Sequence, residues 1–389
     1  MIDAADRHGT RVVWTAFVVA VFGWGVGFYG PAVYLPVLHR THGWSLSILS
    51  AAITAHYLVS AVLIIALPDA YRRFGVARVT QGGTLLGAAG AIAWANAQQT
   101  WQLVPALLLS GAGWAAMSGA ALNAMVSPWF ERDRPKALSM AFNGASVGGI
   151  VLVPLWMALA GGFGLAPAAF LMSIAMVAIV CPLAFRTLQR RPAVAVSKTR
   201  PLPRLALLRQ PRFLTISLAF ALGLFAQIGL FAHLIARLEP VLGPSLAAGA
   251  ISLITVCAVV GRTLLARLLG EHDRRLAAAA NLLMQAVGVL LLALGEGSVP
   301  LTAGCILFGL GVGNLLSLPP LIAQREFRLA DVGTVVALVT AINQAVFAFA
   351  PAIFGALRDS TGSYVVPFLV AGGVQTLAAA IIFLGRRFS

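Results

Sequence analysis

The chain has few charged residues and very few carboxylates. Only 10% of its 389 residues are charged, against roughly 25% in an ordinary soluble domain, and 60% are hydrophobic. Its mean hydropathy is +0.91. It contains two lysines and twelve acidic residues, and its formal net charge is +15. This composition excludes an ordinary soluble protein and leaves few side chains for acid–base chemistry.

Other chemical signatures are also missing. The sequence has no glycine-rich phosphate loop with a lysine, which excludes an ATP-driven pump within this chain. It has no metal-ligand spacing of His, Cys and carboxylate residues. Its three cysteines, Cys181, Cys257 and Cys305, lie in apolar stretches without paired spacing and are interpreted as small packing residues. We therefore expect no enzyme activity, no metal and no cofactor.

Apolar stretches of about 20 residues recur along the whole chain. Each is long enough to cross a hydrocarbon core of ~30 Å as a helix, the structure in which every backbone polar group is satisfied within the span. The sequence predicts twelve spans, at residues 12–37, 45–67, 79–98, 101–128, 137–160, 164–185, 213–237, 245–269, 276–295, 299–323, 333–356 and 363–385.

The basic residues alternate with these spans. If both termini are cytoplasmic, the cytoplasmic segments hold 22 of the 27 lysines and arginines, and the remaining five are Arg40, Arg237, Arg262, Arg267 and Arg358. Positive charge accumulates on the cytoplasmic side of membrane proteins. We therefore expect a multi-pass protein of the inner membrane with both termini in the cytoplasm. Because the charge is spread over short loops, it fits anionic membrane lipids rather than nucleic acid.

The two halves of the chain resemble each other at a spacing of 200 residues. Ala137, Leu138, Ala141, Asn143 and Ala145 recur as Ala337, Leu338, Ala341, Asn343 and Ala345. The Pro- and Arg-containing interval 186–212 separates six spans from six. The expected fold is an all-α membrane protein with twelve transmembrane helices in two pseudo-symmetric six-helix bundles, at 1–185 and 213–389, joined by a cytoplasmic linker at 186–212.

This layout resembles the major facilitator superfamily over essentially the whole chain. Residues 68–75 followed by Arg78 are similar to its loop motif between spans two and three, although Pro68 is a departure. The resemblance implies alternating access, with a cytoplasmic gate formed by Asp69, Arg72, Arg73 and Arg78. Finer features, which include Asn123, residues 128–130, Arg132, Arg134, residues 144–149 and Pro154, resemble the monocarboxylate and oxalate–formate branches. The proline of drug antiporters in span five is replaced by Ala145.

Arg262 is the main candidate for substrate binding. It lies inside the eighth predicted span, where a charged residue costs at least ~2.5 kcal/mol on insertion scales and therefore faces a cavity or a partner. None of the twelve acidic residues lies in the middle of a span. The expected partner of the planar guanidinium of Arg262 is therefore an anion that arrives as substrate. In the resembled carboxylate transporters, an arginine of this span contacts the substrate carboxylate. The alternative is that Arg262 snorkels or binds a carbonyl at a helix end.

Three departures from the resembled branches narrow the range of expected substrates. Ala258 stands where animal monocarboxylate symporters have an aspartate, and span one has no lysine. The second cation that the oxalate exchanger carries in span eleven is also missing. A monoanion held by one cation is therefore favoured over a clamped dianion.

Further polar residues inside the spans are candidates to shape the pocket. They are Tyr29, His56, Asn123, Asn143, Gln227, Asn314 and Asn343. His56 and His233 are also possible proton carriers because a histidine titrates near neutral pH, although a lone histidine in a helix is often a packing residue. For Asn143 and Asn343, a helix–helix hydrogen bond explains an inward position equally well.

The sequence thus predicts a monomeric secondary transporter of a small organic anion, in the first place a monocarboxylate, with a coupled proton or counter-anion. The first alternative is an exporter of amphipathic or drug-like compounds, which calls for an acidic residue in the cavity. The second is a membrane receptor that does not transport.

Overall fold

The computed structural model describes residues 4–131, 133–190 and 201–388, and within these ranges the chain is helical with no β-strand. It forms two compact units, residues 1–197 and 198–389. The helices of the first unit are α1 (Ala4–Phe22), η1 (Gly23–Phe28), α2 (Gly30–His42), α3 (Leu46–Phe74), α4 (Val76–Ala95), η2 (Thr100–Gln102), α5 (Leu103–Ala115), α6 (Gly119–Val126), η3 (Ser127–Trp129), α7 (Arg134–Val147), η4 (Gly148–Leu152), α8 (Val153–Phe163) and α9 (Leu165–Thr187). Those of the second are α10 (Arg204–Leu208), α11 (Pro211–Leu269), α12 (Arg274–Leu294), α13 (Ser298–Val312), α14 (Asn314–Glu326), α15 (Leu329–Phe347), α16 (Ala350–Thr361), α17 (Val365–Leu384) and η5 (Gly385–Phe388).

The twelve predicted spans are confirmed. Among the described residues, eleven helical segments are long and apolar enough to cross a membrane, and each coincides with one of the predicted spans. The twelfth is α4, which matches the predicted span 79–98 but is rich in Gly, Ala and Thr and therefore less apolar. The single long helix α11 contains two spans, because Gly243 at φ +78° turns the chain between them.

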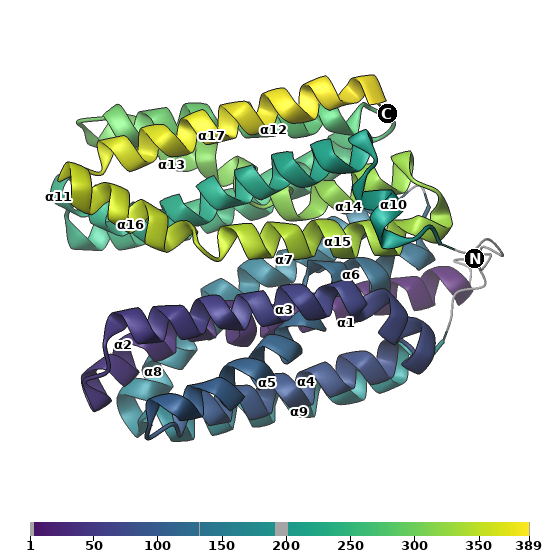
Figure 1. The fold of residues 1–389 in the computed structure, drawn as a ribbon, viewed down its shortest axis with the longest axis horizontal. Coiled ribbons are helices and arrows are strands. Elements are labelled where there is room, and N and C mark those ends of the chain that lie inside the picture. The colour runs from purple at the N-terminus through teal and green to yellow at the C-terminus, as the bar shows by residue number, and fades with distance from the viewer. Residues whose placement is uncertain (1–3, 132, 191–200, 389) are drawn as a thin grey trace. The chain divides into compact units, whose positions relative to one another are not determined.

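The two units repeat the same pairing of helices. In the first, α4 packs on α5 and α9, α3 on α5, and α1 on α7. In the second, the corresponding spans pair alike, since α12 packs on α13 and α17, and α11 on α13 and α15 (Figure 1). Gly90 of α4 lies against the backbone of Ser110, and Gly288 of α12 lies against the backbone of Phe308. Gly288 and Phe308 follow Gly90 and Ser110 by 198 residues each. The repeat seen in the sequence is therefore a repeat of helix contacts.

Several spans are broken into two helices placed end to end. The first span changes from α1 to α2 through the wide turn η1, in a stretch with Gly23, Gly25, Gly27 and Pro31. The tenth span breaks at Gly313, between α13 and α14. Such breaks release backbone carbonyls that another group must satisfy, because no water is available inside a bilayer.

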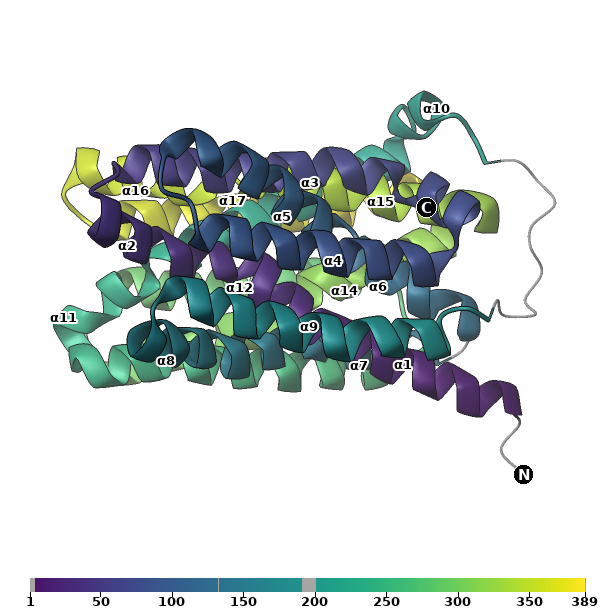
Figure 2. The same ribbon diagram turned by 90° about the horizontal axis from the view of Figure 1, so that it is seen from below.

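Two local expectations differ from the structure. The predicted loop beginning at Pro68 is helical up to Phe74, and α3 ends only at Gly75, whose φ of +82° suits glycine. In the predicted linker, residues 204–208 form the short helix α10, held by the fully buried Leu207 (Figure 2). Residues 191–200 of that linker and Arg132 of the family motif lie outside the described residues.

Candidate functional site

Arg262 is buried in the second unit, at 3% exposure. Its Nε donates a hydrogen bond of 2.9 Å to the carbonyl oxygen of Gly313, at the break between α13 and α14. Gly313 permits this contact because it has no side chain: a Cβ there would lie 2.6 Å from Nη2 of Arg262 and 2.8 Å from the carbonyl oxygen of Ala258. Of the two interpretations made from the sequence, the structure therefore displays the contact with a carbonyl at a helix end.

Two asparagines hold the same break, Asn314 at the start of α14 and Asn281 from α12. Asn314 Nδ2 donates to Asn281 Oδ1 at 2.8 Å and to the carbonyl of Leu310 at 3.1 Å. Asn281 Nδ2 donates to the carbonyl of Gly311 at 3.2 Å. The end of α13 thus has its carbonyls bound by side chains. Asn314, predicted to shape the pocket, lies next to Arg262 through Gly313, whereas the sequence analysis missed Asn281.

His56 of α3 is fully buried in the first unit and both of its ring nitrogens have partners. Nε2 lies 3.1 Å from the carbonyl oxygen of Gly27, and Nδ1 lies 2.8 Å from the hydroxyl of Ser110. Trp94 Nε1 donates to the same hydroxyl at 3.0 Å. Because the Gly27 carbonyl can only accept, Nε2 carries a hydrogen, and Nδ1 accepts the hydroxyl hydrogen of Ser110. The arrangement is complete for a neutral imidazole.

The reason for the His56 contact lies in the first span. Pro31 has no N–H, so the carbonyl four residues earlier, that of Gly27, loses its helical partner. His56 supplies the missing donor. A cavity of only about 10 Å³ remains beside these residues, which holds one water at most. A role of His56 in carrying protons stays a prediction, and its geometry is that of a packing residue.

Tyr29 belongs to a group of neighbouring rings in the first unit, in which Phe28 contacts both Tyr29 and Tyr57, and Tyr57 contacts His56. The Tyr29 ring lies 5.1 Å from that of Phe28, and the hydroxyl of Tyr57 donates to the Phe28 carbonyl at 2.8 Å. On the other side, a Cβ at Gly149 would lie 3.0 Å from the Tyr29 ring. Tyr29 and His56 therefore belong to one cluster at the break of the first span.

The other predicted residues lie on α6, α7, α11 and α15. Asn123 accepts a hydrogen bond of 2.6 Å from Ser127, and His233 Nε2 lies 3.2 Å from the carbonyl oxygen of Pro351. Gln227 and Asn343 are buried in α11 and α15, at 4% and 5% exposure. Asn143 occupies in α7 the repeat position of Asn343. Their roles in binding stay predictions.

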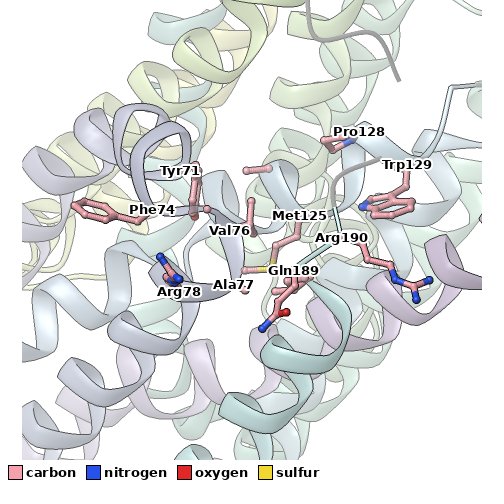
Figure 3. A pocket seen from close by; sticks show the side chains of 13 residues that line it. Tyr71, Phe74, Val76, Ala77, Arg78, Met125, Pro128, Trp129, Gln189 and Arg190 are labelled. Atoms are coloured by element: carbon pink, nitrogen blue, oxygen red, sulfur yellow. The ribbon is translucent and has the colours of Figure 1, made fainter. Parts of the chain in front are cut away.

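The predicted gate lies at the end of the first unit where α3 meets α4. Asp69 and Arg72 form an ion pair one helical turn apart, and Arg73 stacks on the ring of Phe74. Both ion-pair partners are about half exposed, so the pair contributes little free energy, about 0–1 kcal/mol. Arg78 lines a cavity of about 360 Å³ together with Tyr71, Trp129 and Arg190 (Figure 3).

The second unit also contains a buried ion pair that was not predicted from the sequence. Arg275 of α12 is 1% exposed and donates from Nε and Nη2 to the two carboxylate oxygens of Glu326, at 2.7 and 2.8 Å. Nη1 donates to the hydroxyl of Thr215, and Nη2 to the carbonyl of Arg212. The pair joins the start of α12 to the end of α14 and the start of α11. The only signal for this ion pair in the sequence is that its residues lie at the charged ends of three spans. These spans are far apart in the sequence.

The described part of the chain contains no group of three or more His, Cys, Asp or Glu side chains that could hold a metal ion. Inside the spans, the described residues offer guanidinium, imidazole, amide and hydroxyl groups and aromatic rings, which can bind and orient a solute.

No curated protein matches the sequence. Solved structures with a similar fold include the transporter FucP in its outward conformation, at 17% identity and a TM-score of 0.73 over 98% of this chain and 99% of that chain. A variant of the E. coli fucose:proton symporter FucP gives 18% identity and a TM-score of 0.74 over 97% and 99%. The human organic anion transporter MFSD10 (TETRAN) gives 17% identity and a TM-score of 0.76 over 96% and 99%. The sequence profile of the Major Facilitator Superfamily matches residues 13–351. Together with the twelve spans in two repeated bundles, this match means that the chain is a multi-pass membrane protein that belongs to the Major Facilitator Superfamily of transporters.

Proposed function

We propose that this transporter moves a small organic anion, in the first place a monocarboxylate, across the inner membrane by alternating access. The observation that carries the proposal is the buried guanidinium of Arg262. Its plane is fixed by a backbone carbonyl at a helix break, and a planar guanidinium binds a carboxylate through two parallel hydrogen bonds.

The depth of Arg262 supports this role. A charged side chain inside a membrane span is costly to bury and therefore serves a site or a partner. The Gly313 carbonyl orients the guanidinium through Nε. A buried cation held in a fixed orientation at this position suits an anionic solute.

A single such cation favours a monoanion. Ala258, one turn before Arg262, provides no carboxylate for an Asp–Arg proton relay, so coupling to protons or to a counter-anion uses other groups. The human transporter of similar fold is described as carrying organic anions, so the same architecture accommodates this class of solute. The likeness to the monocarboxylate and oxalate–formate branches points the same way. The charge alternation supports an orientation with both termini in the cytoplasm.

The test is uptake of carboxylates by proteoliposomes containing Arg262→Gln or Arg262→Lys. The substrate panel is first narrowed by the rise in melting temperature that each carboxylate produces in the purified protein. Truncating one partner of a buried charge pair costs about 2–5 kcal/mol, so kcat/KM for Arg262→Gln is expected to fall roughly 30- to several-thousand-fold. Lysine lacks the planar fork and is expected to restore little.

Arg267→Gln is the matched control, because Arg267 lies further along the same helix and is exposed. It is expected to transport normally. Unchanged carboxylate uptake by Arg262→Gln would remove the anion assignment. Transport of amphipathic cations would instead favour an exporter, and binding without counterflow would identify a receptor.

A further inference from the structure

A basic groove lies in the first unit, between the start of α1 and the end of α9. The two helices pack side by side there (Figure 2), and a cavity of about 430 Å³ opens between them. Three arginines line it: Arg11 from α1, Arg186 from the last turn of α9, and Arg190 just beyond that helix. No acidic side chain is among the residues that line this cavity. The groove therefore concentrates positive charge at one end of the unit.

These arginines do not hold the two helices together. The contact between α1 and α9 is made by Thr15 and Thr187, whose hydroxyls are 3.0 Å apart, and by His8, whose Nε2 lies 3.0 Å from the carbonyl oxygen of Thr187. Arg11, Arg186 and Arg190 are exposed, and within the part of the chain that the structure describes none of them forms an ion pair. Their charge is available to a ligand.

The groove is amphipathic along its length. On α1, Arg11 is followed at helical spacing by Trp14 and Val18, so one face changes from charged to apolar toward the membrane interior. On α9, which runs in the opposite direction, Leu183 precedes Arg186 by one turn. Trp14 is 53% exposed, which suits an indole at the level of the lipid headgroups. An inorganic anion would contact only the charged half of this groove.

We propose that this groove binds an anionic phospholipid, with the phosphate of its headgroup between the three arginines and the start of an acyl chain against Val18 and Leu183. Arginine is well matched to phosphate because its N–H groups bind two oxygens at once. Basic pockets between membrane helices on the cytoplasmic side are suited to anionic headgroups, and each basic residue near an anionic membrane surface strengthens binding by roughly 5-fold.

The test measures the melting temperature of the purified full-length protein in a neutral detergent, by its tryptophan fluorescence. Three probes are titrated: dioctanoyl phosphatidylglycerol, dioctanoyl phosphatidylcholine and inorganic phosphate. Phosphatidylglycerol is expected to raise the melting temperature at concentrations at which the other two have no effect. In the double variant Arg11→Gln/Arg186→Gln, the concentration of phosphatidylglycerol needed should rise roughly 30-fold.

The control removes the same charge elsewhere, in Arg209→Gln/Arg387→Gln, which should respond like the original chain. Arg11→Lys/Arg186→Lys keeps the charge and should recover most of the response, which separates lost binding from a damaged fold. An equal effect of inorganic phosphate would mean a free-anion site, and an equal effect of phosphatidylcholine would mean unspecific solvation. Either result, or equal loss in the control variant, overturns the proposal.

Discussion

The contact between Arg262 and Gly313 can be tested by adding a single methyl group. Gly313 has helical backbone angles, φ −65° and ψ −25°, that alanine adopts freely, so Gly313→Ala acts only through space. Its Cβ would lie 2.6 Å from Nη2 and 2.8 Å from Nε of Arg262, and 2.8 Å from the Ala258 carbonyl oxygen. The guanidinium can withdraw, but the Ala258 backbone cannot. We therefore expect Arg262 to lose its hydrogen bond to the carbonyl of residue 313.

The size of the effect follows from this geometry. A hydrogen bond to a charged group contributes about 1.5–3 kcal/mol, and overpacking costs about 1–3 kcal/mol. If Arg262 holds the substrate, uptake by Gly313→Ala should show kcat/KM reduced roughly 10- to 100-fold, measured as initial rates in proteoliposomes and normalised to folded protein. Gly333→Ala is the matched control, since Gly333 is exposed in α15 and its Cβ would have no neighbour within 4 Å.

A double-mutant cycle makes the test specific. Once Arg262→Gln has removed the guanidinium, adding Gly313→Ala should cost little more transport, because both changes act on the same contact. Normal uptake by Gly313→Ala would refute the reasoning, and so would a full additional loss in the double variant, since the methyl group would then act somewhere other than on Arg262.

Three further outcomes are expected. Arg275→Met or Glu326→Gln alone should lower the free energy of unfolding by about 3–5 kcal/mol, whereas replacing both with apolar residues should recover most of it in thermal unfolding. His56→Gln should leave the pH profile of uptake unchanged, and His56→Leu should lower the melting temperature, because it leaves the buried carbonyl of Gly27 without the donor that His56 supplies; a changed profile in the glutamine variant would favour proton transfer. Burial would raise the pKa of Asp273, but hydrogen bonds from the start of α12 and from Arg386 outweigh it and hold the pKa below its ordinary value of 3.8. The stabilisation by Asp273 is therefore present above pH 3.8 and lost as the pH falls below it, so the melting temperatures of Asp273→Ala and the original chain should converge in acid.

The spans could be predicted from the sequence because two independent signals agree on them. Apolar length predicted all twelve spans, including the one that becomes α4, whose small residues weaken its hydropathy, and the alternation of basic loops agrees with that number. The residues at which the helices end were harder to predict from the sequence. Pro68 suggested a loop, yet α3 continues to Phe74, since a proline inside a membrane helix costs little when its neighbours satisfy the freed carbonyl.

The candidate residues were predictable by type but not by contact. A charge in the middle of an apolar span singles out Arg262 from the sequence alone. The periodicity of one helix cannot say which neighbour its polar face meets, so Asn281 and the pair of Arg275 and Glu326 went unnoticed. Their partners lie on other helices, more than thirty residues away in the sequence.

Two of the buried titratable side chains, His56 and Arg262, meet helix breaks in the same way, with different consequences. At the first break, the carbonyl freed by Pro31 and the hydroxyl of Ser110 together use both nitrogens of His56, and a neutral ring satisfies both. At the second, the carbonyl of Gly313 engages Nε of Arg262. That bond lies in the guanidinium plane, so the backbone at residue 313 sets the direction of the Nη groups. A lysine ammonium has no plane for the carbonyl to fix. Loss of transport in Arg262→Lys, together with normal transport in His56→Gln, is therefore the combination expected if the first break is structural and the second positions the substrate.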